Sequence, residues 1–171
     1  SLTSLSESAI QATKLTSMVF MILIGATAFG LVFKALGGDR LVETFFSSMG
    51  VSATGFILIS MAIIFILGFF LDFIEICFIV VPILEPVARQ LGLDPLWFAI
   101  LIAMNLQTSF LTPPFGFSLF YLKAVAPKQI RATHIYKGVT PFILIQLVAI
   151  ILIAAFPKTV TWLPDLMDRY N

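Results

Sequence analysis

The sequence is poor in the residues on which soluble enzymes depend. Its 171 residues include one cysteine and one histidine, and only 11% of them are charged. A single cysteine excludes an internal disulfide and a cysteine-based zinc site, and soluble domains carry roughly 25% charged residues. The sequence has no glycine-rich phosphate loop and no cluster of metal ligands, and its net charge of +1 gives no reason to expect nucleic acid as a partner. We therefore expect neither an enzyme nor a nucleic-acid-binding protein.

Apolar residues are abundant instead. They make up 60% of the chain, with 18 Phe, and the mean hydropathy is +1.07. Several apolar runs approach the ~20 residues that cross a bilayer as a helix, so the sequence predicts an all-α polytopic membrane protein. We expect Cys77 to be a buried, inert thiol. The first residues lack the basic patch and short apolar core of a signal peptide, which favours an internal start within a longer protein.

The alternation of apolar and polar stretches divides the chain into six segments. We expect an interfacial lead-in at 1–16, transmembrane spans with a broken helix at 17–93, a re-entrant hairpin at 94–125, an interfacial basic helix at 126–137, a span at 138–157 and an interfacial tail at 158–171. Within the second segment, residues 53–89 would run ~55 Å as one helix, against a hydrocarbon core of ~30 Å. The stretch must break, and the natural place is Gly68 to Glu75. One broken span and two crossings both fit.

The re-entrant hairpin is predicted from a proline-rich interruption. Asp94-Pro95 predicts a helix start, with Asp as the N-cap and Pro at the first helical position. The Pro-Pro pair after Thr112 removes two backbone donors, and hydrocarbon offers no water to replace their bonds. The arms at 95–110 and 116–125 would be ~24 and ~15 Å long. The second arm is too short to cross alone, which favours a hairpin over a kinked span.

Oxygen-bearing side chains gather at the tip of this hairpin. Hydroxyl, amide and freed carbonyl oxygens are what a desolvated Na⁺ needs, and half-helix N-termini can face an anionic substrate. The same residue types also satisfy a broken helix, so structural repair is the alternative. Asp72 and Glu75 share one face if a helix continues through them; they suit a cation or proton site, or mark a helix end at the headgroups. The candidate substrate- and ion-binding residues are Asn105, Gln107, Thr108, Ser109, Thr112, Pro113, Pro114, Gly116, Asp72 and Glu75.

The remaining charged residues predict local structure. Glu85 and Arg89 are four residues apart, which indicates a helix ion pair. The excess of Lys and Arg at 123–137 indicates a cytoplasmic loop, and Thr140-Pro141 predicts the start of the last span. His134 lies among these basic residues, so we expect a solvated side chain there and not a catalytic base.

Several ordered motifs resemble one family. They are Gly68-Phe-Phe-Leu-Asp72, Pro82-Ile-Leu-Glu-Pro86, Gly92-Leu-Asp-Pro-Leu-Trp-Phe98, Leu111-Thr-Pro-Pro-Phe-Gly116, Ile135-Tyr-Lys-Gly-Val-Thr-Pro-Phe142 and Trp162-Leu-Pro164. As a set they are similar to the large membrane subunit of TRAP (tripartite ATP-independent periplasmic) transporters, from about residue 17 onward. The run Asn105-Leu-Gln-Thr-Ser-Phe110 departs from the more usual Gly ahead of Thr-Pro-Pro. It is similar to the branch labelled for mannitol, chloroaromatic or 2-oxo acid substrates.

The resemblance implies the C-terminal repeat of an inverted-repeat, elevator-type carrier in the bacterial inner membrane. It implies uptake of an organic acid with Na⁺ as the coupling ion and no other cofactor, and a Na⁺ site near Ser109, Thr112 and Gly116. The implied partners are a small membrane subunit, a periplasmic substrate-binding protein, the N-terminal half of the large subunit and the lipid bilayer. The family implies a hairpin that opens toward the periplasm, whereas the charge count indicates cytoplasmic entry, so the side is left open.

Two other classes of function remain. A structural or assembly subunit would have no ion site of its own, and replacing Asn105 or Thr112 would then affect only stability. A membrane-embedded enzyme would need a second polar cluster from another chain, with Ser109 or His134 essential for activity. An aqueous channel fits worst, because no span carries a continuous polar stripe.

Overall fold

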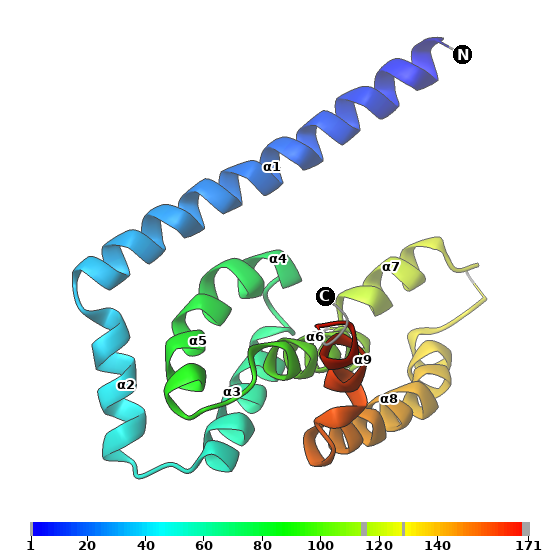
Figure 1. The fold of residues 1–171 in the computed structure, drawn as a ribbon. Coiled ribbons are helices and arrows are strands. Elements are labelled where there is room, and N and C mark those ends of the chain that lie inside the picture. Colours follow the sequence, from blue (N-terminus) through cyan, green and yellow to red (C-terminus); the bar gives the residue numbers. More distant parts are fainter. Residues whose placement is uncertain (1, 114–115, 128, 169–171) are drawn as a thin grey trace.

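The computed structural model describes residues 2–113, 116–127 and 129–168, and these residues form helices joined by short turns, without a strand. The elements are α1 (Leu2–Ala35), α2 (Gly38–Ser48), α3 (Ala53–Leu67), α4 (Phe73–Glu75), the π-helix η1 (Ile76–Val80), α5 (Val81–Gln90), α6 (Pro95–Leu111), α7 (Phe117–Val125), α8 (Ala132–Ala155) and α9 (Lys158–Asp168). Figure 1 shows α3, α5 and α6 grouped together, with α1 extending away from them. The all-helical prediction is confirmed.

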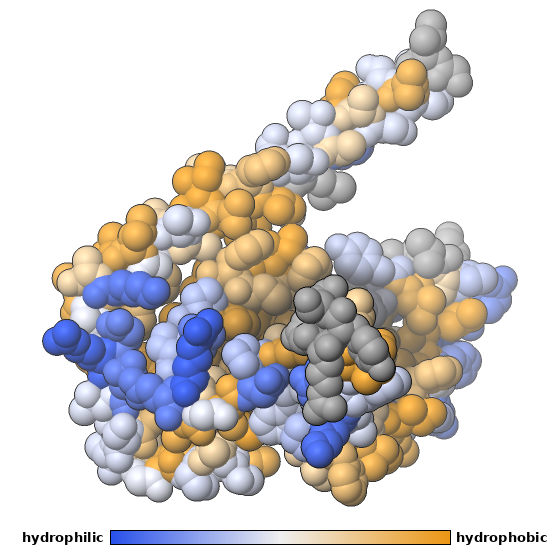
Figure 2. All heavy atoms as spheres, viewed as in Figure 1, coloured by the Kyte–Doolittle hydropathy of each residue, from blue (hydrophilic) through white to orange (hydrophobic). Residues whose placement is uncertain are grey.

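Helix α1 is one continuous helix of 34 residues, about 51 Å long at ~1.5 Å per residue. It covers both the lead-in predicted at 1–16 and the start of the span predicted from residue 17, because no proline or glycine interrupts the first 24 residues. The interfacial position of the lead-in stays a prediction. Thr13 also donates its hydroxyl to the Ala9 carbonyl at 2.8 Å, which satisfies a polar side chain within the helix. Figure 2 shows a more hydrophilic start of α1 and a hydrophobic half toward α2.

Residues 53–90 form two helical arms joined by a turn. Ser52 caps α3 by accepting a hydrogen bond from the Gly55 amide at 3.3 Å, and the helix ends at Leu67. Residues 68–72 form a turn, and the chain then comes back through α4, η1 and α5, which contact α3 or its neighbours (Figure 1). The interruption falls within the stretch where the sequence predicts a break. Helical arms lie on both sides of it, and one broken span and two crossings both stay predictions.

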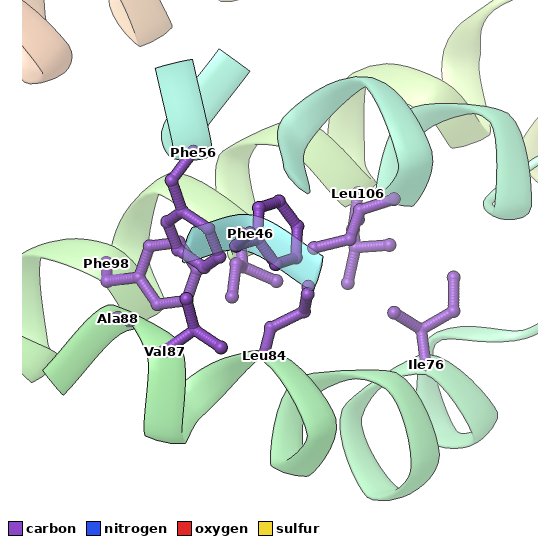
Figure 3. Packing of buried hydrophobic residues seen from close by; sticks show 10 residues of the cluster. Phe46, Phe56, Ile76, Leu84, Val87, Ala88, Phe98 and Leu106 are labelled. Atoms are coloured by element: carbon purple, nitrogen blue, oxygen red, sulfur yellow. The ribbon is translucent and has the colours of Figure 1, made fainter. Parts of the chain in front are cut away.

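The core lies where α2, α3, η1, α5 and α6 meet. The Phe56 ring packs edge-on against Phe46 of α2, with centroids 5.0 Å apart, and lies 5.8 Å from the Phe98 ring of α6. Figure 3 shows the side chains that fill this core, namely Phe46, Phe56, Ile76, Leu84, Val87, Ala88, Phe98 and Leu106. Close packing at this junction fixes α6 against the α3–α5 pair.

Two local predictions about α5 and α6 are confirmed. Asp94 caps α6 by accepting a hydrogen bond from the Trp97 amide at 2.7 Å, with Pro95 as the first helical residue. Glu85 and Arg89 form the expected ion pair on α5. Helix α6 ends at Leu111, and α7 starts at Phe117.

Helix α8 differs from the sequence prediction. We expected a separate basic helix at 126–137 and a span that starts at Thr140-Pro141. Instead α8 begins at Ala132, after the N-cap Arg131, and runs through Pro141 to Ala155. Pro141 has no backbone N–H, so the helix lacks one hydrogen bond at this position. In the same turn, Thr140 donates its hydroxyl to the Tyr136 carbonyl at 2.8 Å. The basic residues after 131 are therefore the first turns of α8.

Among the residues that the structure describes, two helices are long and apolar enough to cross a membrane. They are Thr3–Ala35 and Ala132–Ala155, and only 6% of the apolar window of each is buried inside the structure. Large side chains such as Phe20, Ile24, Phe142 and Ile145 are exposed on them. Exposed apolar helices of this length are characteristic of contact with lipid. The shorter apolar helices α3 and α6 lie in the protein core.

Candidate functional site

The turn that follows α3 contacts the last turn of α6. Gly68, the first residue after α3, is buried against Ser109, which lies two residues before the end of α6. A Cβ atom added at Gly68 would overlap the Ser109 hydroxyl and lie 3.0 Å from the Ser109 Cβ. The 68–72 turn and the break after Leu111 therefore belong to one site, although they are far apart in the sequence.

Asn105 ties α6 to α3 one turn earlier. Its Nδ2 donates to the Met61 carbonyl of α3 at 2.8 Å, and its side chain is 6% exposed. A buried amide needs such a partner, because an unpaired one costs about 1–3 kcal/mol. The observed role of Asn105 is to hold the two helices together beside the interruptions.

Three hydroxyls follow Asn105 and bond within their own helix. Thr108 donates to the Met104 carbonyl at 2.8 Å, Ser109 to the Leu106 carbonyl at 2.9 Å, and Thr112 to the Thr108 carbonyl at 2.7 Å. Thr108 and Ser109 are fully buried. A hydroxyl that donates its proton keeps its lone pairs. These oxygens can therefore still accept a hydrogen bond or coordinate a cation.

Two hydrogen bonds between nearby backbone groups stabilise the chain after α6. The Thr112 amide donates to the Ser109 carbonyl at 3.1 Å, and the Gly116 amide donates to the Thr112 carbonyl at 3.1 Å. A Cβ at Gly116 would overlap the Phe110 carbonyl and lie 3.0 Å from the Thr112 carbonyl oxygen. Glycine is therefore required here for close backbone approach. Pro113 is half-buried, and the predicted site residue Pro114 lies outside the described residues.

Gln107 lies on another face of α6. It is exposed and lines an apolar cavity of about 400 Å³ together with Phe73, Cys77, Ala103 and Phe110. The structure therefore separates Gln107 from the buried group at Asn105, Thr108 and Ser109. Cys77 is exposed as well, so the prediction of a buried thiol is wrong. It lies on the side of η1 that faces this cavity, and not on the side of Ile76 that enters the core.

The two acidic residues do not share one helical face. Asp72 precedes α4 and caps it, since its Oδ1 accepts a hydrogen bond from the Phe73 amide at 2.7 Å. Glu75 lies inside α4, and both residues are half-buried. Asp72 also lines a second cavity, of about 470 Å³, with Phe73 and Phe110. Because Phe73 and Phe110 border both cavities, these two rings lie between the apolar cavity and the acidic one.

Sequence reasoning missed three contributions to this site. Ser118 and Tyr121 of α7 and Met18 of α1 line the cavity beside Asp72. The spacing of residues within one helix does not predict these neighbours, because tertiary packing places α1 and α7 beside Asp72. The sequence predicts a break that starts at Gly68, but it does not predict the contact of Gly68 with α6.

The side chains near the break carry oxygens of the kind that binds hard cations, and not the nitrogen and sulfur ligands of transition metals. Within the part of the chain that the structure describes, no three His, Cys, Asp or Glu residues lie close enough to hold a metal ion. The oxygens that gather are hydroxyls and main-chain carbonyls, which are ligands for hard cations. The hydroxyl lone pairs of Ser109 and Thr112, beside the carbonyls of the break, are the groups that fit Na⁺.

The exposed apolar helices and the two interruptions define an all-helical membrane protein. The chain belongs to the family described as "Tripartite ATP-independent periplasmic transporter, DctM component", whose model matches residues 1–159.

Three relatives illustrate the range of this family. The sialic acid TRAP transporter permease protein SiaT of Haemophilus influenzae is 30% identical over 167 residues, which are 97% of this chain and 27% of the relative. The C4-dicarboxylate TRAP transporter large permease protein DctM of Pseudomonas aeruginosa is 29% identical over 156 residues, 91% of this chain and 36% of the relative. The ectoine/5-hydroxyectoine TRAP transporter large permease protein UehC of Ruegeria pomeroyi is 28% identical over 155 residues, 89% of this chain and 35% of the relative.

These relatives are transporter permeases and not enzymes. The chain spans about a third of the length of the curated relatives it matches. Their names cover several substrates, so the branch for mannitol, chloroaromatic or 2-oxo acids stays a prediction.

Proposed function

We propose that this chain is the C-terminal half of a TRAP transporter large permease, which couples the uptake of an organic acid to the entry of Na⁺. Membership of the DctM family supports this proposal. The match to 27% of SiaT and 36% of DctM is consistent with a part of a longer permease. The protein would lie in the bacterial inner membrane. Its partners would be the N-terminal half of the permease, a small membrane subunit and a periplasmic binding protein that delivers the substrate.

The observation that carries the proposal is the contact between the turn after α3 and the last turn of α6, next to the break after Leu111, in an apolar protein. Backbone that leaves the helix at membrane depth persists only where protein or a water-filled cavity surrounds it. Transporters place substrate and ion sites at such points. Here Gly68 meets the buried Ser109 hydroxyl, and the buried Thr108 precedes Ser109 in α6.

We propose that Na⁺ binds between Ser109, Thr112 and Gly116. These residues offer neutral oxygens, which attract a monovalent cation without a large charge to desolvate. The ion would hold the break after Leu111 in one conformation and complete one wall of the substrate site, and the other repeat would supply the opposite wall. Helices α3 to α7 would then move together across the membrane as an elevator. Each Na⁺ that crosses a potential of 100 mV contributes about 2.3 kcal/mol.

The alternative is a structural or assembly subunit without an ion site. One observation favours it, since each of the hydroxyls of Thr108, Ser109 and Thr112 bonds to its own helix. Such bonds are sufficient to satisfy a helix end without any ion. The two functions differ in one measurable property, which is the dependence of uptake on Na⁺.

Uptake into proteoliposomes that contain the complete transporter tests the proposal. The binding protein and a panel of 2-oxo, aromatic, C4-dicarboxylic and sialic acids are placed outside, with and without an inward Na⁺ gradient. We expect Na⁺-dependent accumulation that Thr112→Val abolishes or strongly reduces. Thr27→Val is the matched control, because the Thr27 hydroxyl makes the same type of bond, to the Leu23 carbonyl at 2.8 Å, on the exposed helix α1. Uptake that is indifferent to Na⁺ would refute the ion site and favour the structural alternative.

A further inference from the structure

Position 68 requires glycine because there is no space for a side chain, and not because of its backbone conformation. Its φ and ψ are −63° and −9°, an ordinary right-handed conformation that any residue adopts. By contrast, Gly37 has a φ of 74°, where a side chain would be strained. A methyl group at Gly68 would overlap the Ser109 hydroxyl and lie 3.3 Å from the Ile64 carbonyl oxygen. The contact with Ser109 is therefore the reason for a glycine at this position.

The Ser109 side chain has little room to move away from a larger side chain at position 68. Its side chain is 0% exposed, and its hydroxyl donates to the Leu106 carbonyl at 2.9 Å. The bond from Asn105 to the Met61 carbonyl holds α6 against α3 one turn away. A side chain at position 68 must therefore push the 68–72 turn outward or rotate the Ser109 hydroxyl away from its acceptor.

Ser109 is also bonded directly to the break that follows α6. The Thr112 amide donates to the Ser109 carbonyl at 3.1 Å, and the Thr112 hydroxyl donates to the carbonyl of the adjacent Thr108 at 2.7 Å. A displacement of Ser109 would therefore change the position of Thr112. The path from the 68–72 turn to the break at 112–116 consists of one packing contact and one backbone hydrogen bond.

We propose that Gly68 is a positioning residue, whose contact with Ser109 joins the two interruptions into one unit and sets the affinity of the ion site at Thr112. The inference rests on the proposed Na⁺ site and adds to it a residue that acts through packing. The 68–72 turn belongs to the α3–α5 pair and Ser109 belongs to α6. Ion binding at one interruption would thus fix the geometry of the other.

A double-mutant cycle between positions 68 and 109 tests this coupling. The complete permease is purified as the wild type, Gly68→Ala, Ser109→Gly and the double variant. Thermal unfolding is first measured in choline chloride and then during titration with NaCl at constant ionic strength. Gly138→Ala in α8 is the matched control, because nothing lies within 4 Å of a Cβ added there.

We expect Gly68→Ala to raise the Na⁺ concentration for half-maximal stabilisation about tenfold. In choline chloride the double variant should be as stable as Ser109→Gly alone, because the added methyl group then meets no side chain. Na⁺ affinity is compared only among the wild type, Gly68→Ala and Gly138→Ala, since Ser109 is itself a proposed ligand. Gly138→Ala should behave as the wild type. Wild-type Na⁺ affinity in Gly68→Ala would overturn the proposal. So would a double variant whose loss of stability equals the sum of the two single losses.

Two further outcomes separate this inference from the proposed function. A wild-type permease that Na⁺ does not stabilise would overturn the ion site and, with it, the coupling. A wild type that responds to Na⁺, with additive losses of stability at 68 and 109, would overturn the coupling alone. If Gly68→Ala does not fold, Ser109→Thr enlarges the other side of the contact. A weaker Na⁺ response would then support the coupling, and an unchanged response would overturn it.

Discussion

Helices α6 and α8 contact each other and are both strongly apolar, yet they lie in different surroundings. In α6, eight of 17 residues are buried, including the polar Asn105, Thr108 and Ser109. In α8, one of 24 residues, Ile135, is buried. Apolar composition alone therefore does not distinguish a helix in the core of this structure from a helix on its surface. The buried polar residues make that distinction, since they need partners that lipid cannot provide.

The comparison predicts the largest difference for two phenylalanines. Phe98 of α6 is 3% exposed and Phe142 of α8 is 62% exposed. We expect Phe98→Ala to lower the free energy of unfolding by about 3–5 kcal/mol, because it leaves a cavity beside Phe56 that the core cannot fill. Phe142→Ala replaces a contact with lipid or detergent and should cost less than about 1 kcal/mol. Denaturant unfolding of the complete permease measures both. Equal losses would show that α8 packs against protein as α6 does.

Local signals in the sequence predicted much of the fold. The Asp94-Pro95 start of α6, the Glu85–Arg89 pair and the interruption near Gly68 all depend on residues within one or two turns. The start of α8 at Ala132 was not predicted, because Thr140-Pro141 carries the signals of a helix start and also fits inside a helix. A proline costs one backbone bond, which a long helix tolerates.

The candidate site was predictable in its residues more than in its geometry. The pattern from Asn105 to Gly116 identified the hydroxyls and the glycine, but it could not show that Gln107 faces away from them. Nor could it show that Ser109 packs against Gly68, since that contact depends on how α3 crosses α6. Contacts between distant segments follow from tertiary packing, which periodicity within one helix does not encode.

The side-chain amides of Asn105 in α6 and Gln146 in α8 differ in their hydrogen bonds. The Asn105 amide of α6 donates to the Met61 carbonyl at 2.8 Å. The Gln146 Oε1 of α8 is buried and has no partner among the described residues. Asn105→Ala should cost about 2 kcal/mol, because it removes the bond and leaves a void beside α3. Gln146→Leu should change stability by less than about 0.5 kcal/mol or increase it, since the lost oxygen makes no bond. Thermal unfolding of the permease compares them. A large loss from Gln146→Leu would indicate that the rest of the permease provides a partner.

The smallest predicted difference between a variant and its control concerns the hydrogen bond that joins α6 to α8. The Trp97 indole Nε1 donates to the Ile153 carbonyl at 2.7 Å. Ile153 lies in the last turn of α8, where carbonyls lack a partner within the helix. Trp97→Phe keeps an aromatic ring but removes the donor, so we expect a loss of about 1 kcal/mol.

Trp162→Phe is the matched control for this change, because Trp162 is 57% exposed on α9. It should change the free energy of unfolding by less than about 0.5 kcal/mol. Hydrogen exchange at the end of α8 provides a second measurement. Removal of the cap should increase exchange in the last turn of α8 in Trp97→Phe and leave the buried turns of α6 unchanged. Faster exchange throughout α6 would contradict a local role. Such a result would mean that α8 stabilises α6, and that α8 belongs to the core and not to the exposed helices.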